Sequence, residues 1–245
     1  MTTETPQNEI DKDDIPLPSW YFLLMTIPML LVFGFPLFFF TQTLTWLEAW
    51  LFSIAFAINM TISYLIINKK NPRVIRNRTK AKKVGITDKT KKSAGSDKFI
   101  LPLTGIGFFL TFVLIIFDYN TRWTTIPFVV EIIGLFISNI GLAIMSLAQL
   151  QNAYASKLLD INKDQKLIDT GLYAHVRHPL YSGIIFWILF APISLGSWVS
   201  LIPAILAIIP LLIRIKYEED MLINGMEGYE DYKIRVKYKL IPKVY

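Results

Sequence analysis

The strongest constraint in this sequence is a series of apolar runs, each about as long as the hydrocarbon core of a bilayer is thick. A helix that crosses a membrane needs about 20 mostly apolar residues. Four stretches meet this requirement: residues 20–41, 46–68, 99–117 and 126–150. Only 18% of the residues are charged, against about 25% in an ordinary soluble domain. These runs predict membrane-spanning helices.

A fifth apolar block covers residues 179–213 and is interrupted by Gly196 and Ser197. Because a Gly-Ser pair is typical of a turn, we expect two short helices folded back as a hairpin. The predicted fold class is therefore all-α: a polytopic membrane protein with about six apolar helices. We divide the chain into an acidic tail (1–19), four spans (20–150) and a region expected to carry chemistry (151–245).

The positive charge is concentrated in one segment between two apolar runs. Residues 69–98 contain twelve Lys or Arg residues and two Asp residues, so they account for the net charge of +6. A basic segment beside membrane spans sets topology through the positive-inside rule, or attracts anionic lipid. The first interpretation places this segment, residues 151–178 and residues 214–245 in the cytoplasm. Because this interpretation already explains the positive charge, the charge does not indicate a nucleic-acid partner, and we expect none.

The chain contains no cysteine and two histidines. Disulfides, thiolate zinc sites and cysteine nucleophiles are thereby excluded. A zinc site would need carboxylates to complete it, and we expect no metal. The sequence does not indicate an oligomeric state.

Two polar segments flank the predicted hairpin. Before it, Arg177 and His178 directly precede Pro179, a residue favoured at the first position of a helix. We expect both side chains beside free backbone N–H groups at a positive helix terminus, which suits an anionic group. After the hairpin, Arg214 and Glu218 are four residues apart and share a helix face. Together these groups suit a zwitterionic amino-acid ligand.

The same residues carry a resemblance to a family. The pattern consists of Gly171-Leu172-Tyr173, then the run from Arg177 to Gly183 (RHPLYSG), the hairpin, Arg214 with Glu218-Glu219, and finally GYEDY at 228–232 and LIP at 240–242. It resembles the membrane methyltransferases typified by isoprenylcysteine carboxyl methyltransferase, with phospholipid N-methyltransferases as relatives. Its specific part covers residues 165–245. The motifs WLEAW at 46–50, Asn71-Pro72 and NAY at 152–154 resemble the prokaryotic branch.

The resemblance implies S-adenosylmethionine as the cofactor and a lipid or other lipophilic methyl acceptor. The cofactor pocket would be lined by Gln165, Lys166, Leu167, Ile168 and Tyr173. The methionine end of the cofactor would be held by Arg177, His178, Pro179, Leu180, Tyr181 and Glu218, with Glu218 at the ammonium. Arg214 would face the acceptor. The acceptor is a carboxylate or an amine, and deprotonating an amine would call on Glu219 or His175.

Two other functions remain open at this point. NADPH-dependent sterol reductases share a related hairpin and an Arg-His element, but Pro179 and the adjacent pair Glu218-Glu219 favour the methyltransferases. The alternative from another class is a non-catalytic membrane scaffold or a small transporter. Transporters usually place charges near the membrane midplane, whereas the spans here are nearly free of central charge.

Overall fold

A computed structural model describes residues 15–79, 91–152 and 166–244. Helices dominate these residues, and they contain no strand. Four helical segments are long and apolar enough to cross a membrane: α1 and α2 together (Ser19–Phe33 and Phe35–Thr41), α3 (Leu47–Lys70), α5 (Lys91–Thr121) and α6 (Phe128–Gln151). The prediction of an all-α polytopic membrane protein is confirmed.

The predicted hairpin consists of α7 (Pro179–Ser194) and α8 (Leu201–Gly225). Between them Gly196 adopts a positive φ of 82°, a conformation that a side chain would disfavour. The carboxylate of Glu131 also approaches this glycine so closely that an added Cβ would lie 2.9 Å from its Oε1. The positive φ is the reason that the turn favours glycine, whereas the flexible Glu131 side chain could move aside.

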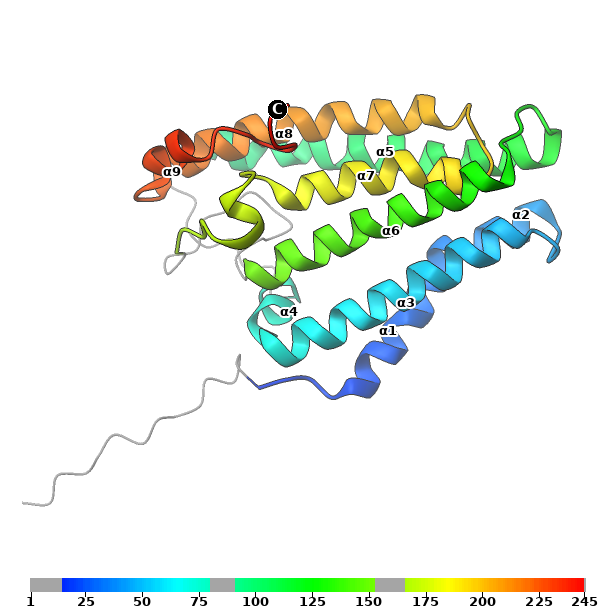
Figure 1. The fold of residues 1–245 in the computed structure, drawn as a ribbon, viewed down its shortest axis with the longest axis horizontal. Helices are drawn as coiled ribbons and strands as arrows, with labels where there is room; N and C mark the ends of the chain where they lie inside the picture. Colours follow the sequence, from blue (N-terminus) through cyan, green and yellow to red (C-terminus); the bar gives the residue numbers. More distant parts are fainter. Residues whose placement is uncertain (1–14, 80–90, 153–165, 245) are drawn as a thin grey trace, which may run out of the picture.

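The described residues also form three short helices: α4 (Pro72–Thr79), the 3₁₀ helix η2 (Gly171–Ala174) and α9 (Tyr229–Arg235). Figure 1 shows α8 running beside α5 and α7 beside α6, with α3 and α1 farther along the same layer. The start of α7, the second half of α8 and α9 lie at one end of the helices. The polar segments that flank the hairpin in sequence are thus neighbours in space.

The third span differs most from its predicted bounds. The apolar run begins at Phe99, but α5 begins eight residues earlier, at Lys91. This extension includes Asp97, which the charge count had assigned to the basic segment. Asp97 is buried because it lies against α8. The first span differs in another way: it is divided at Gly34, and Pro36 stands at the beginning of α2 rather than inside one continuous helix.

The helices approach one another closely at glycines. Packing between helices in a bilayer depends on van der Waals contact, because lipid tails are as apolar as the side chains. A Cβ added at Gly183 of α7 would lie 2.5 Å from the carbonyl oxygen of Gly141 in α6. A Cβ added at Gly107 of α5 would lie 2.8 Å from the Cβ of Ala207 in α8. The two helix pairs thus depend on positions without side chains.

An aromatic core joins the first half of the chain to the hairpin. The ring of Phe33 in α1 lies 5.9 Å from Trp187 in α7, and Phe56 of α3 and Phe108 of α5 lie 5.7 and 5.1 Å from Trp187. Offset and edge-to-face pairs at such distances contribute about 0.5–1.5 kcal/mol each beyond area burial. Trp187 therefore contacts three of the spans and fixes the hairpin against them.

Replacing Gly183 with alanine should destabilise the protein by about 1–3 kcal/mol, because the new methyl group overpacks the contact between α6 and α7. Thermal unfolding in detergent would measure the loss. Gly105→Ala is the matched control, since a Cβ there meets nothing within 4 Å and alanine favours the helix. Equal stability of the two variants would contradict the role assigned to this crossing.

Candidate active site

The candidate site lies at the end of the molecule where α7 begins and α8 turns polar. Residues 236–240, which follow α9, run along the start of α7. The backbone N–H of Arg177 donates to the carbonyl oxygen of Tyr238 at 3.0 Å, and that of His178 donates to Lys239 at 2.8 Å. The hydroxyl of Ser182 donates to Leu240 at 2.7 Å. The C-terminal segment is thus bound to the residues just before α7 and to the first turn of that helix.

The Arg177 side chain joins three segments of the site. Its Nε donates to Oε1 of Glu219 in α8 at 2.7 Å, and its Nη1 donates to the carbonyl oxygens of Val236 and Lys237 at 2.6 and 2.8 Å. Both members of the ion pair are buried. A buried charge is costly unless it is paired and hydrogen-bonded. Arg177 meets this condition with one carboxylate and two carbonyls.

Glu219 is surrounded by positive or hydrogen-bonding groups. Besides Arg177, its carboxylate has Nε2 of His178 at 3.4 Å and Nζ of Lys239 at 3.0 Å. Burial alone would raise the pKa of Glu219, but hydrogen bonds from His178, Arg177 and Lys239 outweigh it and hold the pKa well below its usual range. Glu219 is therefore ionised and a weak proton acceptor at neutral pH.

A second chain of polar contacts begins at Asp97. Its carboxylate accepts two hydrogen bonds from Arg214, Nε to Oδ1 at 2.8 Å and Nη2 to Oδ2 at 3.0 Å. Nη1 of Arg214 donates to the hydroxyl of Tyr181, which donates to Oε2 of Glu218 at 2.6 Å. The bidentate pair fixes the plane of the guanidinium. A continuous series of hydrogen bonds thus connects side chains of α5, α7 and α8.

The two adjacent glutamates differ in accessibility. The Glu218 side chain is 24% exposed, whereas that of Glu219 is 6% exposed. Oε1 of Glu218 has Nδ1 of His178 at 3.9 Å, beyond hydrogen-bonding distance. Lys239, at 26% side-chain exposure, is also accessible. Of the two glutamates, Glu218 is the one that can receive a cationic group from outside.

An aromatic cluster closes the side of the site toward α9. Tyr229, Tyr232 and Val236 are buried together, and Leu167 packs against them. The hydroxyl of Tyr232 donates to the carbonyl oxygen of Tyr173 at 2.7 Å. The buried hydroxyl of Tyr229 has no hydrogen-bond partner among the described residues. Burial, followed by the nearby charges of Glu219 and Glu218, raises the pKa of Tyr229 well above its usual range.

The structure brings most of the predicted site residues together. Arg177, His178, Pro179, Tyr181, Arg214 and Glu219 are buried, and Leu180, Glu218, Leu167 and Ile168 are half-buried. Tyr173 is buried beneath α9, while Lys166 is exposed. Gln165 lies outside the described residues. His175 is exposed, and no ion pair joins it to the cluster among the described contacts.

Sequence reasoning missed Asp97, Lys239 and Tyr229. The sequence did contain an indication of Asp97. This residue stands two positions before the apolar run 99–117, and Arg214 is the first charged residue after the apolar block 179–213. Two opposite charges at the same membrane face are candidates for pairing. Lys239 and Tyr229 had weaker signals, because nothing in the spacing of the C-terminal segment predicted that it folds back over α7.

Three comparisons with known proteins bear on this site. Residues 132–224 match the model of the isoprenylcysteine carboxyl methyltransferase (ICMT) family. The resemblance predicted from the sequence is confirmed. The matched segment extends from α6 through the hairpin and includes Arg177, Arg214 and both glutamates. It ends before Tyr229 and Lys239.

A 77-residue stretch is 38% identical to a protein-S-isoprenylcysteine O-methyltransferase from Schizosaccharomyces pombe, covering 31% of this chain and 33% of the relative. The chain thus matches about a third of the length of this curated relative. A solved structure of the eukaryotic intramembrane Ras methyltransferase ICMT is similar with a TM-score of 0.46 and 17% identity, over 91% of this chain and 87% of that one.

Glu219→Gln should destabilise the protein by about 3 kcal/mol at pH 7, because Arg177 loses its buried counter-charge. A carboxylate with a depressed pKa contributes stability that is fully present above its unfolded value of about 4.3 and is lost as the pH falls below it. The gap between wild type and variant should therefore narrow between pH 7 and pH 3.

Thermal unfolding at both pH values tests this expectation. Asp220→Asn, which changes the exposed neighbouring acid, is the control and should follow the wild type at pH 7. A gap for Glu219→Gln that stays constant between the two pH values would show that the charge of Glu219 does not support the folded state.

Proposed function

We propose that this protein is an integral membrane methyltransferase that uses S-adenosylmethionine and methylates a lipophilic acceptor carrying a carboxylate, such as a prenylcysteine. The observation that carries the proposal is Glu218: a half-buried carboxylate held by Tyr181 beside buried cations, within the segment that matches the ICMT family. A pair of opposite charges at a membrane face fits a zwitterionic cofactor together with an apolar acceptor.

The residues present fit such a cofactor. Glu218 would bind the ammonium of its methionine end, and Lys239 offers an accessible cation for its carboxylate. The buried Tyr229 hydroxyl has no partner among the described residues, and it lies near both glutamates. A buried hydroxyl usually has a hydrogen-bond partner, so a bound cofactor could supply one here. When bound, the cofactor would supply an electrophilic methyl group on a sulfonium, so that transfer to a carboxylate oxygen yields a neutral ester and a thioether.

The chain's own residues would orient the reactants rather than exchange protons. Arg214 is held by Asp97 and Tyr181, so its positive charge has a fixed position for steering an acceptor carboxylate. Holding two reactants in line lowers a barrier by about 7–11 kcal/mol in favourable cases. We assign Glu219 to positioning Arg177, His178 and Lys239, since its low pKa does not favour a role as a base.

This electrostatic arrangement favours a carboxylate over an amine as the acceptor. A carboxylate is already deprotonated at neutral pH, whereas a protonated amine must first lose a proton to a base. Glu219, one of the two residues that an amine acceptor would call on, is a weak base because Arg177, His178 and Lys239 hold its pKa below the usual range. We further propose that the site faces the cytoplasm, because the basic residues Lys69 and Lys70 stand at the same end of the helices as the site.

A direct test combines methyl transfer with product identification. The purified protein in vesicles is incubated with labelled S-adenosylmethionine and an N-acetylated prenylcysteine or, separately, phosphatidylethanolamine. Mass spectrometry should detect one added methyl group on the prenylcysteine. Methylation of the lipid amine alone would overturn the choice of acceptor, and absence of S-adenosylhomocysteine binding would overturn the enzyme class.

Glu218→Gln should weaken the binding of S-adenosylhomocysteine about tenfold, because one charge-assisted contact with the ammonium is reduced to a neutral one. Isothermal titration in detergent measures this affinity. The control Asp220→Asn removes a nearby acid that is exposed, and it should bind like the wild type. Equal affinities for all three proteins would exclude Glu218 from the cofactor site.

Tyr229→Phe and Tyr232→Phe form a matched pair. Removing the unpartnered Tyr229 hydroxyl should leave thermal stability unchanged or higher but weaken S-adenosylhomocysteine binding several-fold, since a buried unpaired group is costly without a ligand. Removing the Tyr232 hydroxyl breaks its bond to Tyr173 and should cost about 1 kcal/mol of stability. Unchanged binding by Tyr229→Phe would assign its hydroxyl no role toward the cofactor.

A further inference from the structure

A groove between α3 and α6 lies apart from the candidate active site. It has a volume of about 530 Å³ and is lined by one face of α3 between Ala55 and Ile67 and one face of α6 between Asn139 and Leu150. This volume is within the range of about 300–1,000 Å³ found for ligand sites. The groove lies on the outer face of the two helices, where Ile58, Ile62 and Leu147 are exposed.

The length of the groove corresponds to one leaflet of a bilayer. Twelve residues separate Ala55 from Ile67 along α3, which is about 18 Å at the helical rise of 1.5 Å per residue. Half of a hydrocarbon core is about 15 Å thick. The groove extends from the middle of α3 to its last turns, so it can accommodate one extended acyl chain of a lipid in a single leaflet.

The polar side chains of the groove are already paired within the protein. Asn59 donates to the carbonyl oxygen of Asn139 at 3.3 Å, and Ser63 donates to Asn59 at 3.4 Å. Asn139 donates to Leu135, and Ser146 to Leu142, both at 2.9 Å. No polar occupant is needed to satisfy these groups, and a hydrocarbon chain suits the predominantly apolar lining.

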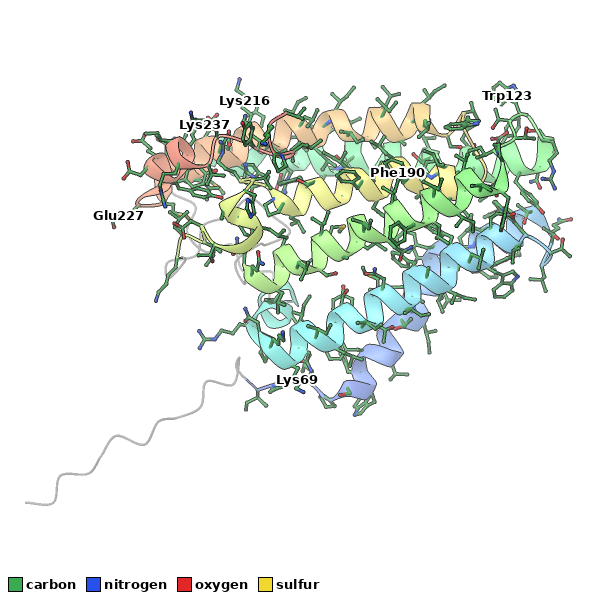
Figure 2. The ribbon with its side chains drawn as sticks, in the orientation of Figure 1. Lys69, Trp123, Phe190, Lys216, Glu227 and Lys237 are labelled. Atoms are coloured by element: carbon green, nitrogen blue, oxygen red, sulfur yellow. The ribbon has the colours of Figure 1, made fainter. Side chains whose placement is uncertain are left out.

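A basic cluster stands where the groove ends. Asn71 donates to the carbonyl oxygen of Leu150 at 3.4 Å and so closes the ends of α3 and α6 together. Next to it Lys69, Lys70 and Arg73 are exposed, and Figure 2 places Lys69 at this end, far from Trp123. The sequence contains no acidic residue between Glu48 and Asp88, so the segment that carries these three residues has no acidic side chain of its own.

We propose that the α3–α6 groove binds one acyl chain of an anionic phospholipid whose headgroup contacts Lys69 and Lys70. The combination of an apolar channel one leaflet long and cations at its mouth matches the shape and charge of such a lipid. This lipid is distinct from the methyl acceptor, because α6 separates the groove from the hairpin: Gly141 and Met145 of α6 contact Gly183 of α7, whereas Ala143 and Leu147 line the groove.

The test measures binding of phosphatidylglycerol and phosphatidylcholine with identical acyl chains to the full-length protein, by native mass spectrometry and thermal stabilisation in detergent. The wild type should prefer phosphatidylglycerol. A double variant, Lys69→Gln with Lys70→Gln, should lose about 30-fold in affinity for it, since a basic residue near an anionic lipid surface contributes about a factor of five. Lys216→Gln, at an exposed lysine of α8, is the control.

A second variant tests the groove itself. Ala143 is exposed within it, so Ala143→Phe should fill the channel without disturbing the core and reduce binding of both lipids. Leu206→Phe on the exposed face of α8 is the control. Equal wild-type binding of the two lipids, or normal phosphatidylglycerol binding by Ala143→Phe, would overturn the proposal. So would methylation of the bound lipid on adding S-adenosylmethionine, which would make it a substrate.

Discussion

The arrangement of the site depends on the buried charge of Glu219. This carboxylate can stay ionised beneath the surface because Arg177, His178 and Lys239 all face it. These three residues come from the segment before α7 and from the C-terminal segment, while Glu219 itself lies in α8. The hairpin, the loop before it and the last part of the chain therefore meet around one compensated charge.

The helices and the hairpin could be predicted from the sequence because their signals are local. Apolar run length indicated the spans, and the Gly196-Ser197 pair indicated the turn, where the positive φ of Gly196 gives the physical reason. The bounds of α5 were not predictable in this way, since its first two turns are polar. Asp97 in these turns pairs with Arg214, 117 residues later, and a contact at such a sequence separation is not part of any local pattern.

The candidate site was predictable in part for the same reason. Adjacent motifs identified Arg177, His178, Glu218 and Glu219, and the hairpin explained how they meet. Their relative accessibility was not predictable, because it depends on which cation contacts which carboxylate. The two glutamates are neighbours in sequence, yet one is enclosed by cations and the other is open. Lys239 is one of the groups that contact Glu219, and backbone hydrogen bonds between residues 177–178 and 238–239 hold its segment in place.

The docking of residues 236–240 on α7 also has a consequence for the biogenesis of the protein. Each span can enter the bilayer as it is synthesised, because its backbone hydrogen bonds form within the helix. The cluster around Glu219, by contrast, is incomplete until the segment containing Lys239 has left the ribosome and folded back. Membrane insertion and completion of the site are therefore separate events in time. A newly inserted chain has its helices before the cluster around Glu219 is complete.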